Sequence, residues 1–270
     1  MLKKRSPFLV RNKFLLLGGL IGIWFVIMLI SLVLSVVAAE DPETLTFTSL
    51  DGLTVTASPY IAHKTTTRPF ILLFHQAEWS RGEYRETAPR LNKLGYNCLA
   101  VDLRAGEEVL GVENLTAGRA REMGAKTRFV DAMQDMVAAI EFVEKSYRPP
   151  NLILMGSSYS ASLALKVGAR YPQQVDGVIA FSPGEYFEKD GLSATWIRAS
   201  AKQLTIPVFI TSARKEKHRW ESIYDAIQSR SKMSYTPATR GQHGSRALWS
   251  HFPDNEGYWT VLDTFLKSYF

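Results

Sequence analysis

The sequence predicts an α/β fold with a doubly wound, mainly parallel sheet, and three observations lead to this prediction. Short apolar runs alternate along the chain with longer segments in which apolar residues recur at helical spacing. Several runs, such as Phe70–Phe74, are apolar throughout, as is typical of strands buried on both faces. The 270 residues can also bury a large core without disulfides, and the single cysteine, Cys98, excludes an intramolecular disulfide.

The expected sheet starts with a hairpin at one edge. Leu45–Ser49 and Leu53–Ala57 alternate apolar with polar residues around Asp51-Gly52, which predicts two antiparallel strands. The later apolar runs are separated by helical segments, which predicts parallel strands. These later strands are Phe70–Phe74, Asn97–Leu103, Leu152–Met155, Gly177–Phe181, Val208–Thr211 and Met233–Thr236.

The expected helices lie between and after these strands. Phe129–Tyr147 has apolar residues at helical spacing and stops before a Pro-Pro pair. Tyr84–Leu94 is amphipathic and is followed by Gly95, although Pro89 lies inside it. The remaining expected helices are Tyr159–Tyr171, Trp220–Ser229 and Tyr258–Tyr269.

The N-terminal region differs in composition from the rest. Residues 1–39 carry five cations and no acid, so only +1 of the formal net charge of +6 belongs to residues 40–270. Residues 14–39 carry no charged side chain, and this 26-residue segment is long enough to form a helix that spans a membrane. We therefore expect an N-terminal hydrophobic helix, a polar linker at 40–44 and one α/β domain at 45–270.

Two interpretations of this leader remain open. An uncleaved signal-anchor explains the length of the apolar segment, whereas Val37-Ala38-Ala39 offers small residues at which a signal peptidase could cut. Both keep the cations in the cytoplasm and predict an exported domain, anchored in the membrane or else secreted or periplasmic. The nearly neutral domain does not indicate a nucleic-acid partner.

A sharp turn between a strand and a helix carries the candidate nucleophile. The strand Leu152–Met155 leads directly through residues 156–160 into a helix. A nucleophile on such a turn needs small residues two positions before and after it, and Ser158 has Gly156 and Ser160 there. The helix N-terminus favours the negative charge that develops during acyl transfer.

Two neighbouring serines are weaker candidates. Ser157 would have Met155 two positions before it, which is too large for the turn. Ser160 has small neighbours but lies too far into the helix. Ser158 is therefore the predicted nucleophile.

A serine nucleophile needs a base, and His243 is the best placed of the five histidines. It lies in a glycine-flanked loop between the last predicted strand and the last helix, where it can reach the carboxyl edge of the sheet. His251 is the alternative. His63 is expected at the surface, and His75 ends a central strand.

The acid that orients this base is expected after the strand Val208–Thr211. Glu216 is the only carboxylate in that loop, and its two lysine neighbours favour the ionised form. Glu221 and Asp225 are alternatives within the following helix.

These residues resemble those of the α/β-hydrolase superfamily, and within it the compact dienelactone hydrolase-like branch, over about residues 45–270. The elbow and the chain order Ser158, Glu216, His243 carry the resemblance. The sequence departs from the usual pattern at Ser160, where glycine is usual, and at Glu216, where aspartate is commoner.

The resemblance implies further residues of the site. The segment after strand Phe70–Phe74 looks like the one that supplies the second oxyanion donor, so the backbone N–H of Ala77 is expected to act with that of Tyr159. His75 and Gln76 would line the site or brace this segment. The expected substrate-binding residues are His75, Gln76, Trp79 and Tyr186.

The cap over the site is expected to be short. About 26 residues separate Phe181 from Val208, including a helical stretch near Trp196, so the site should be open. The irregular stretches 104–127 and 184–206 are long enough to be functional, and they are candidate walls of the site.

The expected function is that of a serine hydrolase that cleaves a small or medium carboxylic ester through an acyl-enzyme on Ser158. No metal and no organic cofactor are implied. Two alternatives from other classes remain open, a non-catalytic binding module on the same fold and an acyltransferase. A peptidase ranks lower, because it usually needs a larger cap or an extra domain.

Overall fold

A computed structural model describes residues 43–270 of the protein. The predicted hydrophobic helix of residues 14–39 and its role as signal or anchor lie outside these residues. Among the helices of 43–270, none combines the length and the apolar character needed to cross a bilayer.

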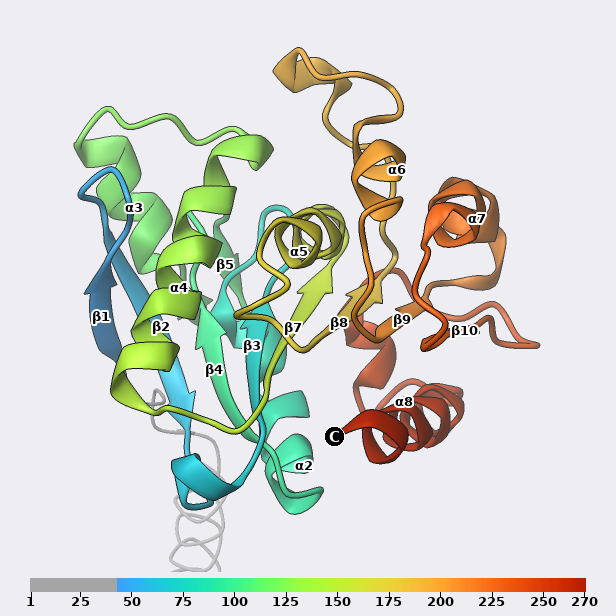
Figure 1. The fold of residues 1–270 in the computed structure, drawn as a ribbon. Helices are drawn as coiled ribbons and strands as arrows, with labels where there is room; N and C mark the ends of the chain where they lie inside the picture. The colour runs from blue at the N-terminus through green and yellow to red at the C-terminus, as the bar shows by residue number, and fades with distance from the viewer. Residues whose placement is uncertain (1–42) are drawn as a thin grey trace, which may run out of the picture. The chain divides into compact units, whose positions relative to one another are not determined.

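The central sheet has eight strands in the order β1-β2-β4-β3-β7-β8-β9-β10 (Figure 1). The six strands from β4 to β10 in this order are parallel, whereas β2 is antiparallel to β1 and to β4. The predicted mainly parallel sheet with an antiparallel hairpin at one edge is therefore confirmed. The strands are β1 (Leu45–Thr48), β2 (Thr54–Tyr60), β3 (Phe70–Phe74), β4 (Asn97–Val101), β7 (Leu152–Ser157), β8 (Gly177–Phe181), β9 (Val208–Thr211) and β10 (Lys232–Tyr235).

Helices cover both faces of this sheet, so its strands have two apolar sides. Phe70, Leu72 and Phe74 pack in the core that includes α4 and α5, and Ile71 and Leu73 pack in the core that includes α2 and α8. The helices are α2 (Thr87–Lys93), α3 (Leu115–Glu122), α4 (Met133–Ser146), α5 (Tyr159–Arg170), α6 (Trp196–Ala201), α7 (Lys217–Ala226) and α8 (Asn255–Tyr269).

The expected helices differ from the observed ones at their ends; the expected 258–269 helix, for example, starts three residues earlier, at Asn255, and the expected 159–171 helix ends at Arg170. The predicted helix 84–94 starts at Thr87 after a 3₁₀ turn, Arg81–Tyr84, so Pro89 falls in the first turn, where its missing N–H costs no helical bond. The predicted 129–147 segment starts with a 3₁₀ turn before α4. The predicted 220–229 helix, α7, starts at Lys217, directly after Glu216, and ends at Ala226.

The stretch 104–127 contains regular structure that the pattern did not reveal. It holds a small hairpin of β5 (Glu108–Val109) and β6 (Val112–Glu113), and then α3. Asn114 starts α3, because its side chain accepts a hydrogen bond from the Ala117 N–H at 2.8 Å. The two strands have two residues each, which is too short for a periodic signal.

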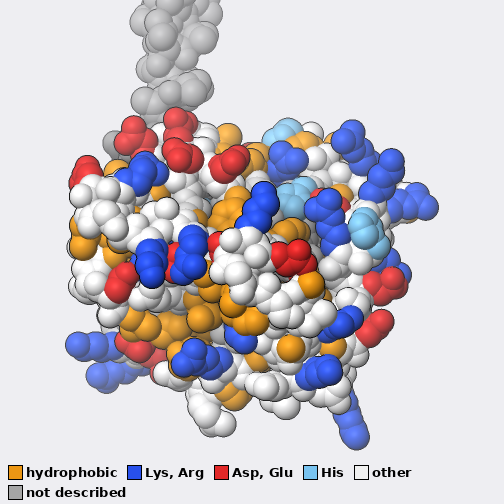
Figure 2. All heavy atoms as spheres, turned by 90° about the horizontal axis from the view of Figure 1, so that it is seen from above, with side chains coloured by type: hydrophobic (Ala, Val, Ile, Leu, Met, Phe, Trp, Pro, Cys, Tyr) orange, Lys and Arg blue, Asp and Glu red, His pale blue; other side chains and the backbone are white. Residues whose placement is uncertain are grey.

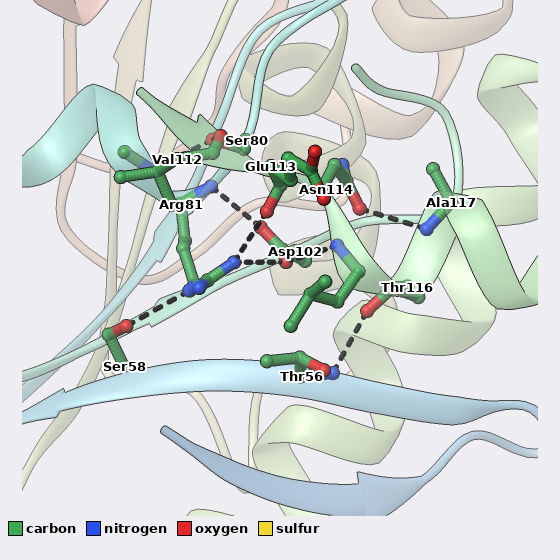
Figure 3. A network of polar contacts seen from close by, with 12 residues as sticks. Thr56, Ser58, Ser80, Arg81, Asp102, Val112, Glu113, Asn114, Thr116 and Ala117 are labelled. Carbon is green, nitrogen blue, oxygen red and sulfur yellow. Dashed lines mark hydrogen bonds and ion pairs between the residues drawn. The ribbon is translucent and has the colours of Figure 1, made fainter. Parts of the chain in front are cut away.

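A buried ion pair fastens this insertion to the end of β4 (Figure 3). Arg81 and Asp102 pair at 2.7 Å, and the Arg81 guanidinium also donates to the Glu113 carbonyl at 2.7 Å. The Asp102 carboxylate accepts a further bond from the Leu115 N–H at 2.9 Å. Because both ions are hydrogen-bonded on several atoms, the cost of their desolvation is offset, and the insertion is held next to the carboxyl edge of the sheet.

Candidate active site

The carboxyl ends of four neighbouring strands lie level with one another. Phe74 of β3 is beside Gly156 of β7, and Ser157 is beside Phe181 of β8, which in turn is beside Thr211 of β9. The residues that follow these strands therefore meet along one edge. That edge is where ligands bind in open parallel sheets.

Ser158 lies on a strained elbow between β7 and α5. Its φ of 59° and ψ of −119° are unusual for a residue with a side chain. A Cβ on Gly156 would meet the backbone of Ser160 and Ala161 at 2.5 Å, so glycine is required two positions before the serine. The predicted turn geometry is thus present.

The two rival serines have other partners. Ser157 is fully buried, and its hydroxyl accepts the Ser245 N–H at 2.9 Å. Ser160 is fully buried and donates to the Phe74 carbonyl at 2.7 Å, which ties the elbow to β3. Ser160 therefore gives the turn a hydrogen bond that the usual glycine could not make.

The predicted acid and base are in contact. The Nδ1 atom of His243 lies 2.7 Å from Oε1 of Glu216, and the Ser182 hydroxyl donates to Oε2 at 2.8 Å. Burial would raise the pKa of Glu216, but the bonds to His243 and Ser182 outweigh it and hold that pKa below its usual range. The ionised carboxylate only accepts, so Nδ1 carries the proton and Nε2 has the lone pair of a base.

The loop that carries His243 is attached directly to the elbow. Gly244 donates its N–H to the Ser182 hydroxyl at 2.9 Å, and Ser245 donates to the Ser157 hydroxyl at 2.9 Å. Gly244 has a φ of 72°, and a Cβ there would meet the Ser157 hydroxyl at 2.5 Å. The imidazole thus belongs to a loop hydrogen-bonded to the residue that precedes Ser158.

Within residues 43–270, the Ser158 hydroxyl and the His243 ring are not hydrogen-bonded to each other. The Tyr186 hydroxyl donates to the Ser182 carbonyl at 2.8 Å, and the Ser158 side chain lies near enough to affect the pKa of Tyr186. Serine–histidine bonds are often long before substrate binds, so this geometry is compatible with a base and nucleophile at rest.

Ser182 is a site residue that the sequence analysis missed. It has a φ of 54° and lies directly after β8, where its hydroxyl joins Glu216 to the loop of His243. Its position at the carboxyl end of a parallel strand is the signal that could have identified it.

The two expected oxyanion donors have no competing acceptor. In the described chain, neither the N–H of Ala77 nor that of Tyr159 donates to a protein oxygen. Tyr159 is the first residue of α5, whose N–H has no intrahelical partner. The backbone N–H of Gln76, which precedes Ala77, donates to the Glu83 carboxylate at 2.7 Å and so fixes this segment.

The position of His75 favours bracing over substrate contact, the two roles expected for it. It is fully buried, with Nδ1 against the Gln76 carbonyl at 2.8 Å and Nε2 accepting the Leu103 N–H at 2.8 Å. It therefore braces the oxyanion segment against the end of β4. Gln76 is also buried, and its side chain packs against Gly244, so it has the same bracing position.

The two aromatic candidates are half-buried and lie in different places. Tyr186 is hydrogen-bonded to the carbonyl of Ser182, whose hydroxyl holds Glu216, so it lies beside the predicted acid. Trp79 follows the oxyanion segment and stacks on Trp249, with ring centroids 5.4 Å apart. Arg246, in the turn after the His243 loop, lies over the Trp79 ring at 5.9 Å.

The alternative base and acids lack such partners. His251 is exposed and lies against the ring of Phe252. Glu221 is exposed and pairs with Lys217 at 3.1 Å, and Asp225 is exposed on α7.

The view onto the carboxyl edge shows histidine side chains among lysines and arginines on this face (Figure 2). Residues 43–270 contain no group of three His, Cys, Asp or Glu that could hold a metal ion.

The fold and this arrangement of serine, histidine and glutamate define an α/β hydrolase. The family model described as "Serine aminopeptidase, S33" matches residues 65–252, and the chain therefore belongs to this family of hydrolases. No curated protein shows significant sequence similarity to the chain.

Solved structures share the fold at low identity. An esterase from Pyrococcus furiosus is 17% identical with a TM-score of 0.62, and the match covers 85% of this chain and 93% of that one. Dienelactone hydrolase from Anabaena variabilis is 15% identical with a TM-score of 0.63, covering 85% and 99%. The esterase domain of a Rhodothermus marinus protein is 15% identical with a TM-score of 0.56, covering 84% and 98%.

Proposed function

We propose that this hydrolase cleaves small or medium carboxylic esters through an acyl-enzyme on Ser158. The observation that carries the proposal is the 2.7 Å contact between Glu216 and His243 on a loop hydrogen-bonded to the strained elbow. A solvated glutamate and a surface histidine would not share a half-buried position at the end of a parallel sheet.

The proposed reaction has two steps. His243 Nε2 takes the Ser158 proton while the serine oxygen attacks the ester carbonyl, and the imidazolium then protonates the leaving alcohol. In the second step, His243 activates water that attacks the acyl-enzyme and releases the acid. Glu216 remains ionised and stabilises the imidazolium in both steps.

The backbone N–H groups of Ala77 and Tyr159 are the proposed oxyanion donors. Two such donors are each worth about 3–4 kcal/mol to the tetrahedral intermediate. Both amides lack a protein acceptor in the described chain, which leaves their hydrogen-bonding capacity for the substrate. This supports acyl transfer chemistry over a binding function alone.

The ester specificity is inferred from the fold's relatives and from the short cap. Two of the structural neighbours reported above are named as esterases, and one as a dienelactone hydrolase. The segment between β8 and β9 contains only a 3₁₀ turn and the six-residue α6. We assign Tyr186 and Trp79 as walls for a small substrate, with Tyr186 nearer to the nucleophile.

The name of the family favours one second candidate, an aminopeptidase. Turnover of p-nitrophenyl acetate and butyrate by the full chain, compared with alanine p-nitroanilide, separates the two. We expect the esters to be cleaved and the anilide to be left intact. In Ser158→Ala, ester hydrolysis should fall at least about 10³-fold. Preferred cleavage of the anilide, or equal ester turnover by Ser158→Ala, would contradict the proposal.

We also propose export of the catalytic domain, on the basis of the cations and the apolar segment in residues 1–39. Cell fractionation and protease accessibility of the domain test this. Protection of the domain inside intact cells would contradict it.

A further inference from the structure

Glu83 connects the three segments that form the candidate site. Its side chain is fully buried, and its Oε2 accepts the Gln76 N–H at 2.7 Å. Its Oε1 accepts the Ser245 hydroxyl at 2.5 Å, and the Ser157 hydroxyl lies near enough to this carboxylate to lower its pKa. One carboxylate thus contacts all three segments.

Each of these partners is close in sequence to a residue of the proposed mechanism. Gln76 precedes the oxyanion residue Ala77, Ser157 precedes the nucleophile, and Ser245 lies two positions after the base. Glu83 also accepts a bond on its backbone carbonyl from the Trp249 ring N–H at 2.9 Å, which fixes the turn that carries it. Movement of the carboxylate would therefore shift donor, nucleophile and base together.

Glu83 differs from the other carboxylates that are fully buried in the described chain. Asp102 pairs with Arg81 at 2.7 Å, and Asp135 pairs with Arg104 at 2.7 Å. Within residues 43–270, Glu83 has no lysine or arginine at ion-pair distance. A buried carboxylate without a cation is costly, so packing alone does not account for it.

Three titratable groups face this carboxylate. Burial raises the pKa of Tyr84 and of Tyr159 well above the usual range, so both stay neutral. His243 is the third group, and a charge on its ring lowers the pKa of Glu83. Burial raises the pKa of Glu83 above its usual range. The hydrogen-bonding groups of Ser245, Ser157 and Gln76 and the charge of His243 act in the opposite direction but do not outweigh burial.

We propose that Glu83 is a positioning residue of the active site, which holds its three segments in register. This proposal rests on the proposed function. The proton that leaves Ser158 passes to His243 Nε2 and from there to the leaving alcohol, and Glu83 neither gives nor takes one. Glu83 acts through Gln76, Ser157 and Ser245 without touching the substrate.

Glu83→Gln has nearly the same shape as the natural side chain and tests the positioning role in the full chain. Asp131→Asn is the matched control, because Asp131 is also buried but has Arg128 as its own partner at 2.8 Å. We expect the control to keep the kcat of wild type.

Ester kinetics of these variants measure the effect. Glu83→Gln should lower kcat about 10–100-fold with KM within about twofold, because substrate contacts remain while the reacting groups lose alignment. Glu83→Asp is one methylene shorter and cannot reach the same partners, so its kcat should also stay reduced. A lower melting temperature with unchanged kcat would overturn the proposal and show a merely structural role. If wild type cleaves no ester, the proposed function fails, and the rate at which a fluorophosphonate probe labels Ser158 in wild type and in Glu83→Gln then decides the positioning role, with equal rates overturning it.

Discussion

His243 has two ring nitrogens, and its surroundings give them different tasks. Nδ1 is held by Glu216 at 2.7 Å, and Glu216 is in turn held by Ser182. Only Nε2 is then available to exchange a proton with the serine. The same reasoning separates His243 from His251, which is exposed and faces a phenyl ring.

Replacement of these two histidines tests the assignment of the base. We expect His243→Ala to lower ester kcat/KM at least about 10³-fold, because the serine proton has no acceptor. His251→Ala should remain within about twofold of wild type, because surface substitutions have small effects. The measurement is p-nitrophenyl butyrate hydrolysis, and loss of activity in His251→Ala alone would reverse the assignment.

Ser182 is expected to matter through orientation of the acid and base. Ser182→Ala removes a donor to Glu216 and the acceptor of the Gly244 N–H, so kcat should fall at least about tenfold, because each lost bond is worth about 1 kcal/mol. Ser200→Ala is the control, because Ser200 is a buried serine that bonds Lys166 on α5, outside the site. Equal kcat values for the two variants would remove Ser182 from the site.

At the scale of elements, the elbow between β7 and α5 decides where the nucleophile lies. Its geometry depends on close backbone approach at Gly156 and on the bond from Ser160 to Phe74. The strand ends beside it are level, so short loops bring Ser158, Ser182 and Glu216 to one edge. The fold thereby places groups that are far apart in the sequence.

Gly156→Ala tests the elbow. Its added Cβ would meet backbone atoms at 2.5 Å, so we expect a loss of about 2–3 kcal/mol in the free energy of unfolding, or displacement of Ser158 with loss of activity. Gly118→Ala, in α3, has no atom within 4 Å of the new Cβ and should be neutral or stabilising. Urea denaturation with an ester assay measures both, and a fully stable, active Gly156→Ala would contradict the elbow geometry.

The regular elements were predictable where their periodicity was strong. The apolar run Phe70–Phe74 and the strand Gly177–Phe181 have the expected bounds, because burial on both faces leaves no alternative pattern. The insertion 104–127 was not predicted in detail. Its hairpin has two-residue strands, and it is held by the buried pair of Arg81 and Asp102 rather than by local propensity.

The candidate site was predictable only in part, for a similar reason. Ser158, Glu216 and His243 follow strands or lie between glycines, and those positions are visible in the sequence. Glu83 and Ser182 contact residues more than 30 positions away, and nothing in the local pattern shows those contacts. His75 was placed correctly at the end of a strand, but only its burial distinguishes bracing from substrate contact.

At the scale of the described domain, two cores and buried polar networks hold the edge of the sheet. The Arg104 side chain pairs with Asp51 and Asp135, and so joins the turn after β1 to α4 and to the residues after β4. His75 joins the oxyanion segment to the residue after Asp102 through the Leu103 N–H. Stability of the domain and order of the site are therefore linked.

This link predicts a loss of stability in mild acid. Burial lowers the pKa of His75 from 6.5 to about 4 in the folded state. In the unfolded chain the His75 ring takes up a proton below about pH 6.5, whereas in the folded chain it stays neutral until about pH 4. The free energy of unfolding therefore falls between these two pH values. We expect a loss on the order of 3 kcal/mol between these values.

Urea denaturation at several pH values between 7 and 4 measures this loss. His75→Gln lacks the titrating ring and should show a flatter dependence, whatever its absolute stability. The pKa of Glu216 is lowered in the folded state, so Glu216 contributes stability that is lost only when its carboxylate takes up a proton, below its ordinary pKa of 4.5. This loss falls at lower pH than most of the loss caused by His75, so the two effects can be separated. Parallel profiles for wild type and His75→Gln would contradict the role of His75.

The central claim is that Ser158 is an activated nucleophile, and a fluorophosphonate probe tests it most directly. The full chain is incubated with the probe, digested, and mapped by mass spectrometry, with Ser158→Ala and His243→Ala in parallel. We expect one adduct, on the peptide that contains Ser158, no adduct in Ser158→Ala and greatly slowed labelling in His243→Ala. Folded wild-type protein that takes up no probe, or takes it up on another serine, would show that Ser158 is not the activated nucleophile.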